Sequence, residues 1–153
     1  MRKLCLIALP CLFFSTLSNA QVSVKEILRK AILLVAAIEE QGHQILLVQL
    51  DNVKAGGSSS QTYPLSSGST YMIVAMGDER IKDIDLCVYD AAGVKIKCDA
   101  DEKNVAIVSL VSSESDRYKF TVKPFAMESV QEGFKDSFKD GFFALIVARM
   151  KEK

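Results

Sequence analysis

Histidine is almost absent from this sequence, since His43 is the only one in 153 residues. A Ser–His–Asp or Cys–His catalytic arrangement would have to use that residue, and no G-x-S-x-G motif accompanies it. The C-x-x-C and H-E-x-x-H spacings of zinc sites are absent, as is a phosphate-binding loop. The sequence therefore argues against an enzyme. We expect His43, which directly follows Gly42, to have a capping or surface role.

No sign of charge dominates the chain, because 19 basic side chains balance 19 acidic ones. Removal of an N-terminal leader containing Arg2 and Lys3 would leave 17 basic and 19 acidic side chains. A near-neutral domain with mixed charges lacks the single-sign field that holds nucleic acid or an anionic membrane surface. We therefore expect no nucleic-acid partner.

Long apolar runs are scarce, and the N-terminal one is short. Two basic residues precede an apolar stretch over residues 4–17, and Ser18 and Ala20 occupy the small-residue positions of a cleavage site. This pattern predicts a signal peptide over residues 1–20. The apolar stretch is shorter than the roughly 20 residues of a membrane-spanning helix. We expect an exported mature chain, periplasmic or extracellular, with no membrane span after cleavage.

After this leader, apolar residues recur at helical spacing. Ser23 and Glu26 have capping-box spacing, Glu26 and Lys30 can pair at i,i+4, and Gly42 provides a stop. These features predict an N-terminal element over residues 21–41, helical from about Val24 and packed on a sheet.

The composition changes at residue 42, where short runs rich in β-branched and aromatic residues begin. About eight such runs, separated by turn sequences, predict a jelly-roll-like antiparallel β-sandwich over residues 42–153. The runs cover residues 44–50, 62–65, 71–76, 83–90, 94–98, 105–111, 117–123 and 142–150.

The stretch DIDLCVYDAAG, residues 83–93, is typical of the first strand and turn of a β-hairpin. Asp90 begins the turn, and Gly93 can take the left-handed conformation of a three-residue loop. With a bulge at Gly93, Cys87 is expected opposite Lys97, and Cys98 opposite Leu86. Strand alternation places Ile84, Leu86, Val88 and Ile96 on one face, and Asp83, Asp85, Cys87 and Tyr89 on the other.

Cys87 and Cys98 are the two cysteines that remain after the leader is removed. An oxidising compartment favours a disulfide between them, whereas the expected register points their side chains to different faces. We expect the bond because of the compartment, and two free thiols remain the alternative.

Four carboxylates approach one edge of the sandwich in this hairpin. Like charges at short range repel, so they require compensation by lysines and backbone amides or by a hard cation. Oxygen ligands would select calcium over zinc, although the spacing does not match an EF-hand loop. We expect no cofactor apart from this alternative of a calcium ion. The four residues are Asp83, Asp85, Asp99 and Asp101, and the nearby lysines are Lys82, Lys97 and Lys103.

The order of features over residues 68–123 resembles that of the bacterial pre-peptidase C-terminal domain. The matching residues are Tyr71, Asp83, Asp85, Leu86, Asp90, Gly93, Asp99, Tyr118 and Val122. The resemblance implies a jelly-roll β-sandwich that acts as a secreted accessory or substrate-binding module, and some members of the family bind calcium. An N-terminal helix and a long segment after Pro124 depart from the family pattern.

Together, these features predict an exported, non-catalytic binding or accessory module with a protein or polysaccharide ligand. A structural protein of the cell envelope and a secreted hydrolase are the alternatives. Met127, Val130, Phe134 and Phe138 recur at helical spacing in the segment before the last strand. Phe134 and Phe138 are therefore candidate partner contacts, with local packing as the alternative.

Overall fold

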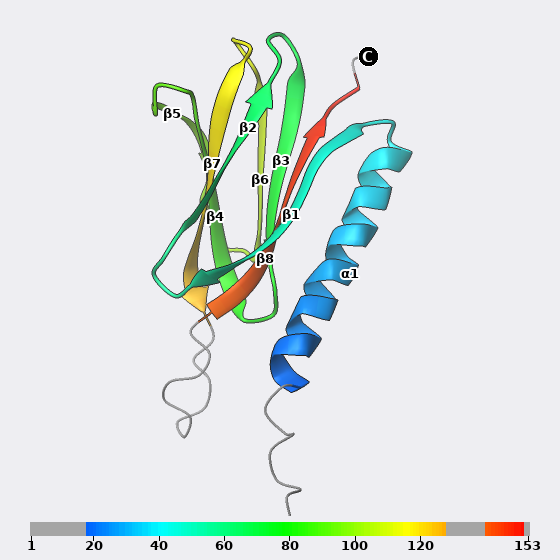
Figure 1. Cartoon of the computed structure of the whole chain (residues 1–153), viewed down its shortest axis with the longest axis vertical. Helices are drawn as coiled ribbons and strands as arrows, with labels where there is room; N and C mark the ends of the chain where they lie inside the picture. Colours follow the sequence, from blue (N-terminus) through cyan, green and yellow to red (C-terminus); the bar gives the residue numbers. More distant parts are fainter. Residues whose placement is uncertain (1–17, 128–139, 152–153) are drawn as a thin grey trace, which may run out of the picture.

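The computed structural model describes residues 18–127 and 140–151, so the predicted contacts Phe134 and Phe138 lie outside the described residues. Within them, a helix precedes eight strands that form two antiparallel four-stranded sheets packed face to face (Figure 1). The elements are α1 Ser18–Glu40, β1 Gln44–Lys54, β2 Ser59–Leu65, β3 Thr70–Gly77, β4 Ile81–Tyr89, β5 Lys95–Asp99, β6 Val105–Val111, β7 Asp116–Met127 and β8 Asp140–Arg149.

The strand order is that of a jelly roll. One sheet, called sheet A, has the order β1-β8-β3-β6, and the other, sheet B, has the order β2-β7-β4-β5. Among the described strands, β4 and β5 are the only sequence neighbours that pair, because every other connection crosses from one sheet to the other. The predicted mainly β sandwich with an N-terminal helix is therefore confirmed.

The main core lies between the two sheets. Strand β4 shows the alternation that produces it, since Ile84, Leu86 and Val88 are fully buried while Asp85 and Cys87 between them are partly exposed. The residues of β4 thus take the faces predicted for them. The largest buried side chains facing them from other strands include Tyr71, Ile73, Phe120, Phe143 and Leu145.

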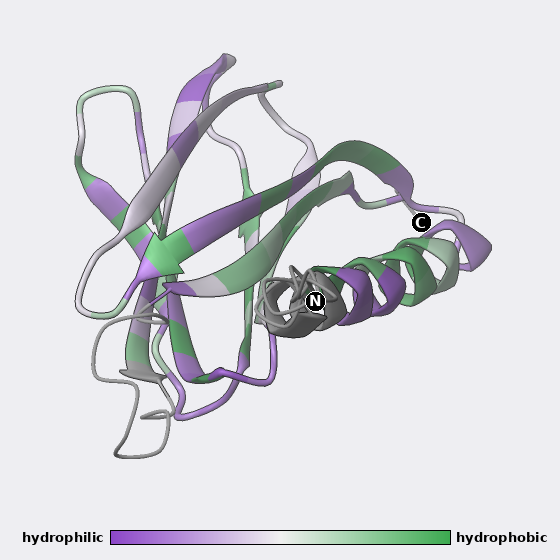
Figure 2. Ribbon diagram, turned by 60° about the horizontal axis from the view of Figure 1, so that its bottom comes forward, coloured by the Kyte–Doolittle hydropathy of each residue, from purple (hydrophilic) through white to green (hydrophobic). Residues whose placement is uncertain are grey.

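A second apolar layer lies on the outer face of sheet A, where α1 packs (Figure 2). Ile27, Ala31 and Ile38 of the helix are buried against a set of sheet residues. Sheet A is consequently apolar on both faces, as the apolar character of the helix predicts. The covered sheet residues are Val74, Met76, Ala144, Ile146 and Ala148.

The C-terminal end of α1 forms a Schellman arrangement. Gly42 has φ +79°, its N–H donates to the Glu39 carbonyl at 2.8 Å, and the His43 N–H donates to the Ile38 carbonyl at 3.3 Å. The predicted stop is confirmed, and Lys30 pairs with Glu26 at 2.9 Å as expected. Within the described residues the helix spans Ser18–Glu40, so it includes the three residues before the predicted element.

A search of the described residues finds no helix with the length and apolarity needed to cross a bilayer.

The edge strands on the two sides of the sandwich are linked by side chains that cross from one sheet to the other. On one side, the Tyr63 hydroxyl of β2 donates to the Leu46 carbonyl of β1 at 3.1 Å. On the other side, Lys97 Nζ of β5 donates to the Ser109 carbonyl of β6 at 2.9 Å. We call these interactions the cross-sheet bonds. They satisfy backbone groups that an edge strand would otherwise leave open.

Candidate binding site

The turn between β4 and β5 has the predicted loop but a different register beyond it. The Gly93 N–H donates to the Asp90 carbonyl at 3.1 Å, Gly93 has φ +81°, and Asp90 exchanges backbone and side-chain hydrogen bonds with Val94. The extra residue is Ile96, because Val88 lies opposite Lys97 while Tyr89 lies opposite Lys95. The bulge therefore lies within β5, and Ile96 is 45% exposed instead of facing the core.

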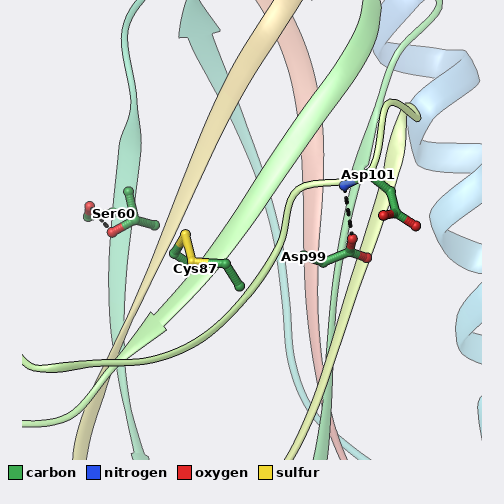
Figure 3. The surroundings of a disulfide bond; sticks show 6 residues. Ser60, Cys87, Asp99 and Asp101 are labelled. Carbon is green, nitrogen blue, oxygen red and sulfur yellow. Dashed lines mark hydrogen bonds between the residues drawn. A yellow bond between two sulfur atoms is a disulfide. The ribbon is translucent and has the colours of Figure 1, made fainter.

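This bulge brings the two cysteines together. Cys87 lies directly opposite Cys98, with the Cα atoms 4.1 Å apart, and a disulfide joins them on the outer side of the hairpin (Figure 3). The expected pairing of Cys87 with Lys97 was wrong, because one residue more in β5 shifts the strand by one position. The geometric objection to a disulfide disappears with that register.

The first two predicted carboxylates, Asp83 and Asp85, lie on β4 between its core residues and are partly buried. Asp83 Oδ1 is shielded from solvent and has no hydrogen-bond partner among the described residues. Burial raises the pKa of Asp85, and the Asp83 carboxylate raises it further. Lys123 on the neighbouring strand lowers the pKa, whereas Asp99 of β5 raises it. Asp83 and Asp85 therefore repel each other in a partly desolvated environment.

The other two predicted carboxylates serve the backbone of the β5–β6 connection. Asp99 Oδ2 accepts the Ile107 N–H of β6 at 2.7 Å, and Asp99 Oδ1 accepts the Asp101 N–H at 3.2 Å (Figure 3). Asp101 pairs with Lys103 at 3.1 Å at an exposed position. Within residues 18–127 and 140–151, no three His, Cys, Asp or Glu side chains form a group that could hold a metal ion.

The β6–β7 turn is built around Tyr118, whose side chain is 2% exposed. Its hydroxyl donates to the Glu114 carbonyl at 3.2 Å and lies 3.0 Å from the buried Ser112 Oγ. The Ser112 N–H donates to the Ser69 carbonyl, which ties this turn to the β2–β3 connection. The turn is thus held by buried polar contacts that fix the direction of its exposed side chains.

A groove of about 440 Å³ lies between the β4–β5 and β6–β7 turns, and we call it the end groove. Its rim carries the carboxylates of Asp90, Glu114 and Asp116, and Tyr118 contributes to its floor. Asp90 Oδ1 and Asp116 Oδ1 each accept a backbone N–H, whereas Glu114 extends from an exposed turn position. The arrangement suits a ligand that presents a positively charged or hydrogen-bond-donating group.

A hollow of about 350 Å³ continues from the end groove onto the outer face of sheet B. Asp90 and Asp116 line both hollows, and Arg117 and Lys119 add positive charge to the second one. The Lys119 ammonium lies 4.7 Å from the centre of the Tyr89 ring. Charges of both signs are therefore presented within one surface at this end of the sandwich.

His43 takes a structural position at the same end of the molecule. Its Nδ1 accepts the Lys151 N–H at 3.0 Å, which joins the α1–β1 connection to the residues following β8. Arg149 donates to the side chain of Gln44 beside it. A shallow hollow of about 340 Å³ lies there, lined by Gly42, Gln44, Ser69, Arg149, Met150 and Lys151.

The sequence did not single out Glu114, Asp116 or Tyr118 as parts of one site together with Asp90. The turn composition SSESD and the Y-x-x-x-V strand after it were recognised, but neither shows that this turn lies beside the β4–β5 turn. That proximity depends on the pairing of β4 with β7, which brings Tyr89 opposite Lys119. Pairing over such a sequence distance has no local signal.

Comparison with known proteins agrees with the fold. No family model matches the chain, and no curated protein matches its sequence. A solved structure with a similar fold is that of Aeromonas hydrophila PliG, a periplasmic lysozyme inhibitor of g-type lysozyme. It is 10% identical, with a TM-score of 0.50, and the match covers 72% of this chain and 90% of PliG. The resemblance to pre-peptidase C-terminal domains stays a prediction from the sequence.

Proposed function

We propose that the protein is an exported, non-catalytic module that binds another protein through the end groove. The observation that carries this proposal is the groove itself: the exposed carboxylates of Glu114 and Asp116 and the partly exposed carboxylate of Asp90 lie at two turns whose backbones are fixed by hydrogen bonds. A preformed rim of this kind loses little side-chain and backbone entropy on binding. A basic side chain on the surface of a partner has the charge and the donors to occupy it.

The fold similarity to a lysozyme inhibitor supports a protein as the partner, and the predicted signal peptide supports export. Similar folds carry unrelated functions, so the partner of PliG serves here as a probe whose binding can be measured. A g-type lysozyme is thus the first protein to test, and soluble peptidoglycan fragments represent the polysaccharide alternative.

The test is a titration of mature protein, residues 21–153, into a g-type lysozyme assay, together with calorimetric binding to the lysozyme and to the peptidoglycan fragments. We expect saturable binding to the lysozyme, and the double variant Glu114→Gln/Asp116→Asn should weaken it roughly tenfold or more, as expected for lost contacts with a charged partner. Glu102→Gln, an exposed charge change in the β5–β6 connection at the opposite end of the strands, is the matched control.

Binding of peptidoglycan fragments but not lysozyme would contradict the choice of a protein partner. Lysozyme binding that is weakened equally by the groove variant and by Glu102→Gln would contradict the choice of the end groove. Circular dichroism of each variant must match that of the wild type, so that a loss of binding reports on the groove and not on folding.

A further inference from the structure

The four edge strands of the sandwich differ in how far their outer backbone groups are satisfied. Strand β6 has its Ile107 N–H and Ser109 carbonyl occupied by side chains of β5. Strand β5 is five residues long and carries lysines, and β2 contains Pro64. Shortness, lysine and proline are common devices that prevent an edge from pairing with another chain. Strand β1, with 11 residues, is the long edge to compare with these.

The backbone groups on the outer edge of β1 already have hydrogen-bond partners near both ends of the strand, at Leu46 and Asn52, but none among the described residues between these ends. The Leu46 carbonyl accepts the Tyr63 hydroxyl, and the Asn52 N–H donates to Asp51 Oδ1 at 2.8 Å. Asn52 lies opposite Phe142, whose carbonyl accepts the Asp78 N–H on the other side of β8. This pair is therefore not hydrogen-bonded, and alternation directs the backbone groups of residues 48 and 50, like those of residue 52, away from β8.

Val48 and Leu50 consequently present N–H and C=O groups at the free edge of sheet A, without a partner among the described residues. Their side chains lie on the outer face of the sheet and are 45% and 39% exposed. The open part of the edge is thus lined by backbone donors and acceptors and by two apolar side chains. An extended strand with apolar residues at alternate positions is the complement of such an edge.

Helix α1 extends this apolar surface. Leu28 and Ile32 follow the buried residues Ile27 and Ala31 by one position, which turns them by about 100° around the helix axis. Seen from the helix side with α1 running upward, a right-handed helix turns these residues to the left of the buried ones. The strand β1, which Figure 1 shows at the edge of sheet A nearest the viewer, lies on that side. Leu28 is 42% exposed and Ile32 is 59% exposed.

We propose that this surface is the contact between two copies of the chain, which pair through β1 in antiparallel orientation about Gln49. In that register, Val48 of one copy forms a hydrogen-bonded pair with Leu50 of the other, and the symmetry repeats the pair. Four backbone hydrogen bonds form, and the facing side chains on the outer face are all apolar.

The occupied ends of β1 single out a second copy as the partner. The same register places Leu46 of one copy opposite Asn52 of the other. The Leu46 carbonyl and the Asn52 N–H, which would otherwise bond to each other there, are both already satisfied within their own chain. Self-pairing about Gln49 therefore leaves neither of these groups without a hydrogen-bond partner. An arbitrary strand would instead bring an unpaired donor or acceptor to each end of the open part of β1.

The helices also fit this arrangement. Both copies of α1 would lie on the same face of a continuous eight-stranded sheet, each over its own β8. Three strand spacings separate the two β8 strands, so the helix axes would lie roughly 14 Å apart. Directly packed helices lie about 8–10 Å apart, and the wider gap leaves space for Leu28, Ile32, Val48 and Leu50 of both copies.

The test is sedimentation velocity and light scattering of the mature chain, residues 21–153, over a concentration series. We expect twice the mass of one chain at high concentration, and Leu50→Lys should raise the dissociation constant roughly tenfold or more, because it places a charge in the apolar contact. Ile107→Lys is the matched control, since Ile107 is 49% exposed on the same face of sheet A at its other edge. It should leave the dimer intact.

Gln49→Cys tests the register directly. Residue 49 would face its own copy in a non-hydrogen-bonded pair, with Cα atoms about 4.5 Å apart, which permits a disulfide. We expect oxidation to give a covalent dimer with this variant and not with Ile107→Cys. A wild-type chain that stays monomeric at all concentrations would overturn the proposal, as would a dimer that Leu50→Lys leaves unchanged. Lysozyme binding by a monomeric Leu50→Lys variant would keep the proposed function separate from this result.

Discussion

Replacing both Cys87 and Cys98 with serine should lower the free energy of unfolding by about 3 kcal/mol. The two residues are separated by 11 positions, and closing a loop of that length removes an entropy from the unfolded chain equivalent to about 3 kcal/mol at 25 °C. For a domain of this size, that change corresponds to a melting temperature roughly 10 °C lower. The folded hairpin itself should persist, because β4 also pairs with β7 along its length.

Urea unfolding monitored by circular dichroism measures the effect, and reduced wild-type protein is the control that should behave like the serine variant. Mass spectrometry after alkylation without reduction establishes the starting state of the thiols. Hydrogen exchange adds a local measurement: the Ile107 amide, bound to Asp99 of β5, should exchange faster once β5 loses its covalent link. A loss below about 1 kcal/mol, or two alkylated thiols in unreduced protein, would refute the reasoning.

Three further predictions concern α1, Asp85 and calcium. A fragment of residues 42–153 should aggregate, because it exposes apolar surface worth about 25 cal/mol per Å² that α1 covers; a soluble, cooperatively unfolding fragment would contradict the packing. The raised pKa of Asp85 means that the folded state binds this proton more tightly than the unfolded chain. Stability should therefore fall as pH rises from the ordinary aspartate pKa to the raised one, and Asp85→Asn should remove this loss in urea titrations at several pH values. Millimolar calcium and excess chelator should give the same melting curve, since the described carboxylates form no group that could hold a metal ion. A melting temperature that rises with calcium concentration would contradict this and support a calcium site.

The strands and the helix could be predicted because each has a local signal. Alternation in DIDLCVYD identified which residues of β4 face the core, and Gly42 identified the end of α1. Those signals reflect sterics and burial within a few residues, so they require no knowledge of distant pairing. The helical state of Ser18 to Ala20 carried no comparable signal, since these residues have the composition of a leader.

The features that the sequence could not predict depend on a single inserted residue or on distant strands. A bulge at Ile96 in place of Gly93 shifts β5 by one position, so that Cys98 lies opposite Cys87 instead of Leu86. Both bulges fit the same composition. The end groove requires the β4–β5 and β6–β7 turns to be neighbours. Asp99 was predicted at a carboxylate cluster, and its charge does raise the pKa of Asp85. The sequence did not show that its side chain also reaches the Ile107 amide of the opposite sheet.

The cross-sheet bonds have a mechanical consequence. The inner faces of the two sheets contact through apolar side chains, which resist separation but offer little directional resistance to sliding. Tyr63 on one side and Lys97 on the other join the sheets at specific atoms, so sliding one sheet along the other must break hydrogen bonds at both margins together. We therefore expect the two sheets to resist sliding together, until the hydrogen bonds at both margins break in one step. The two turns at the end groove should keep their spacing while these bonds are intact.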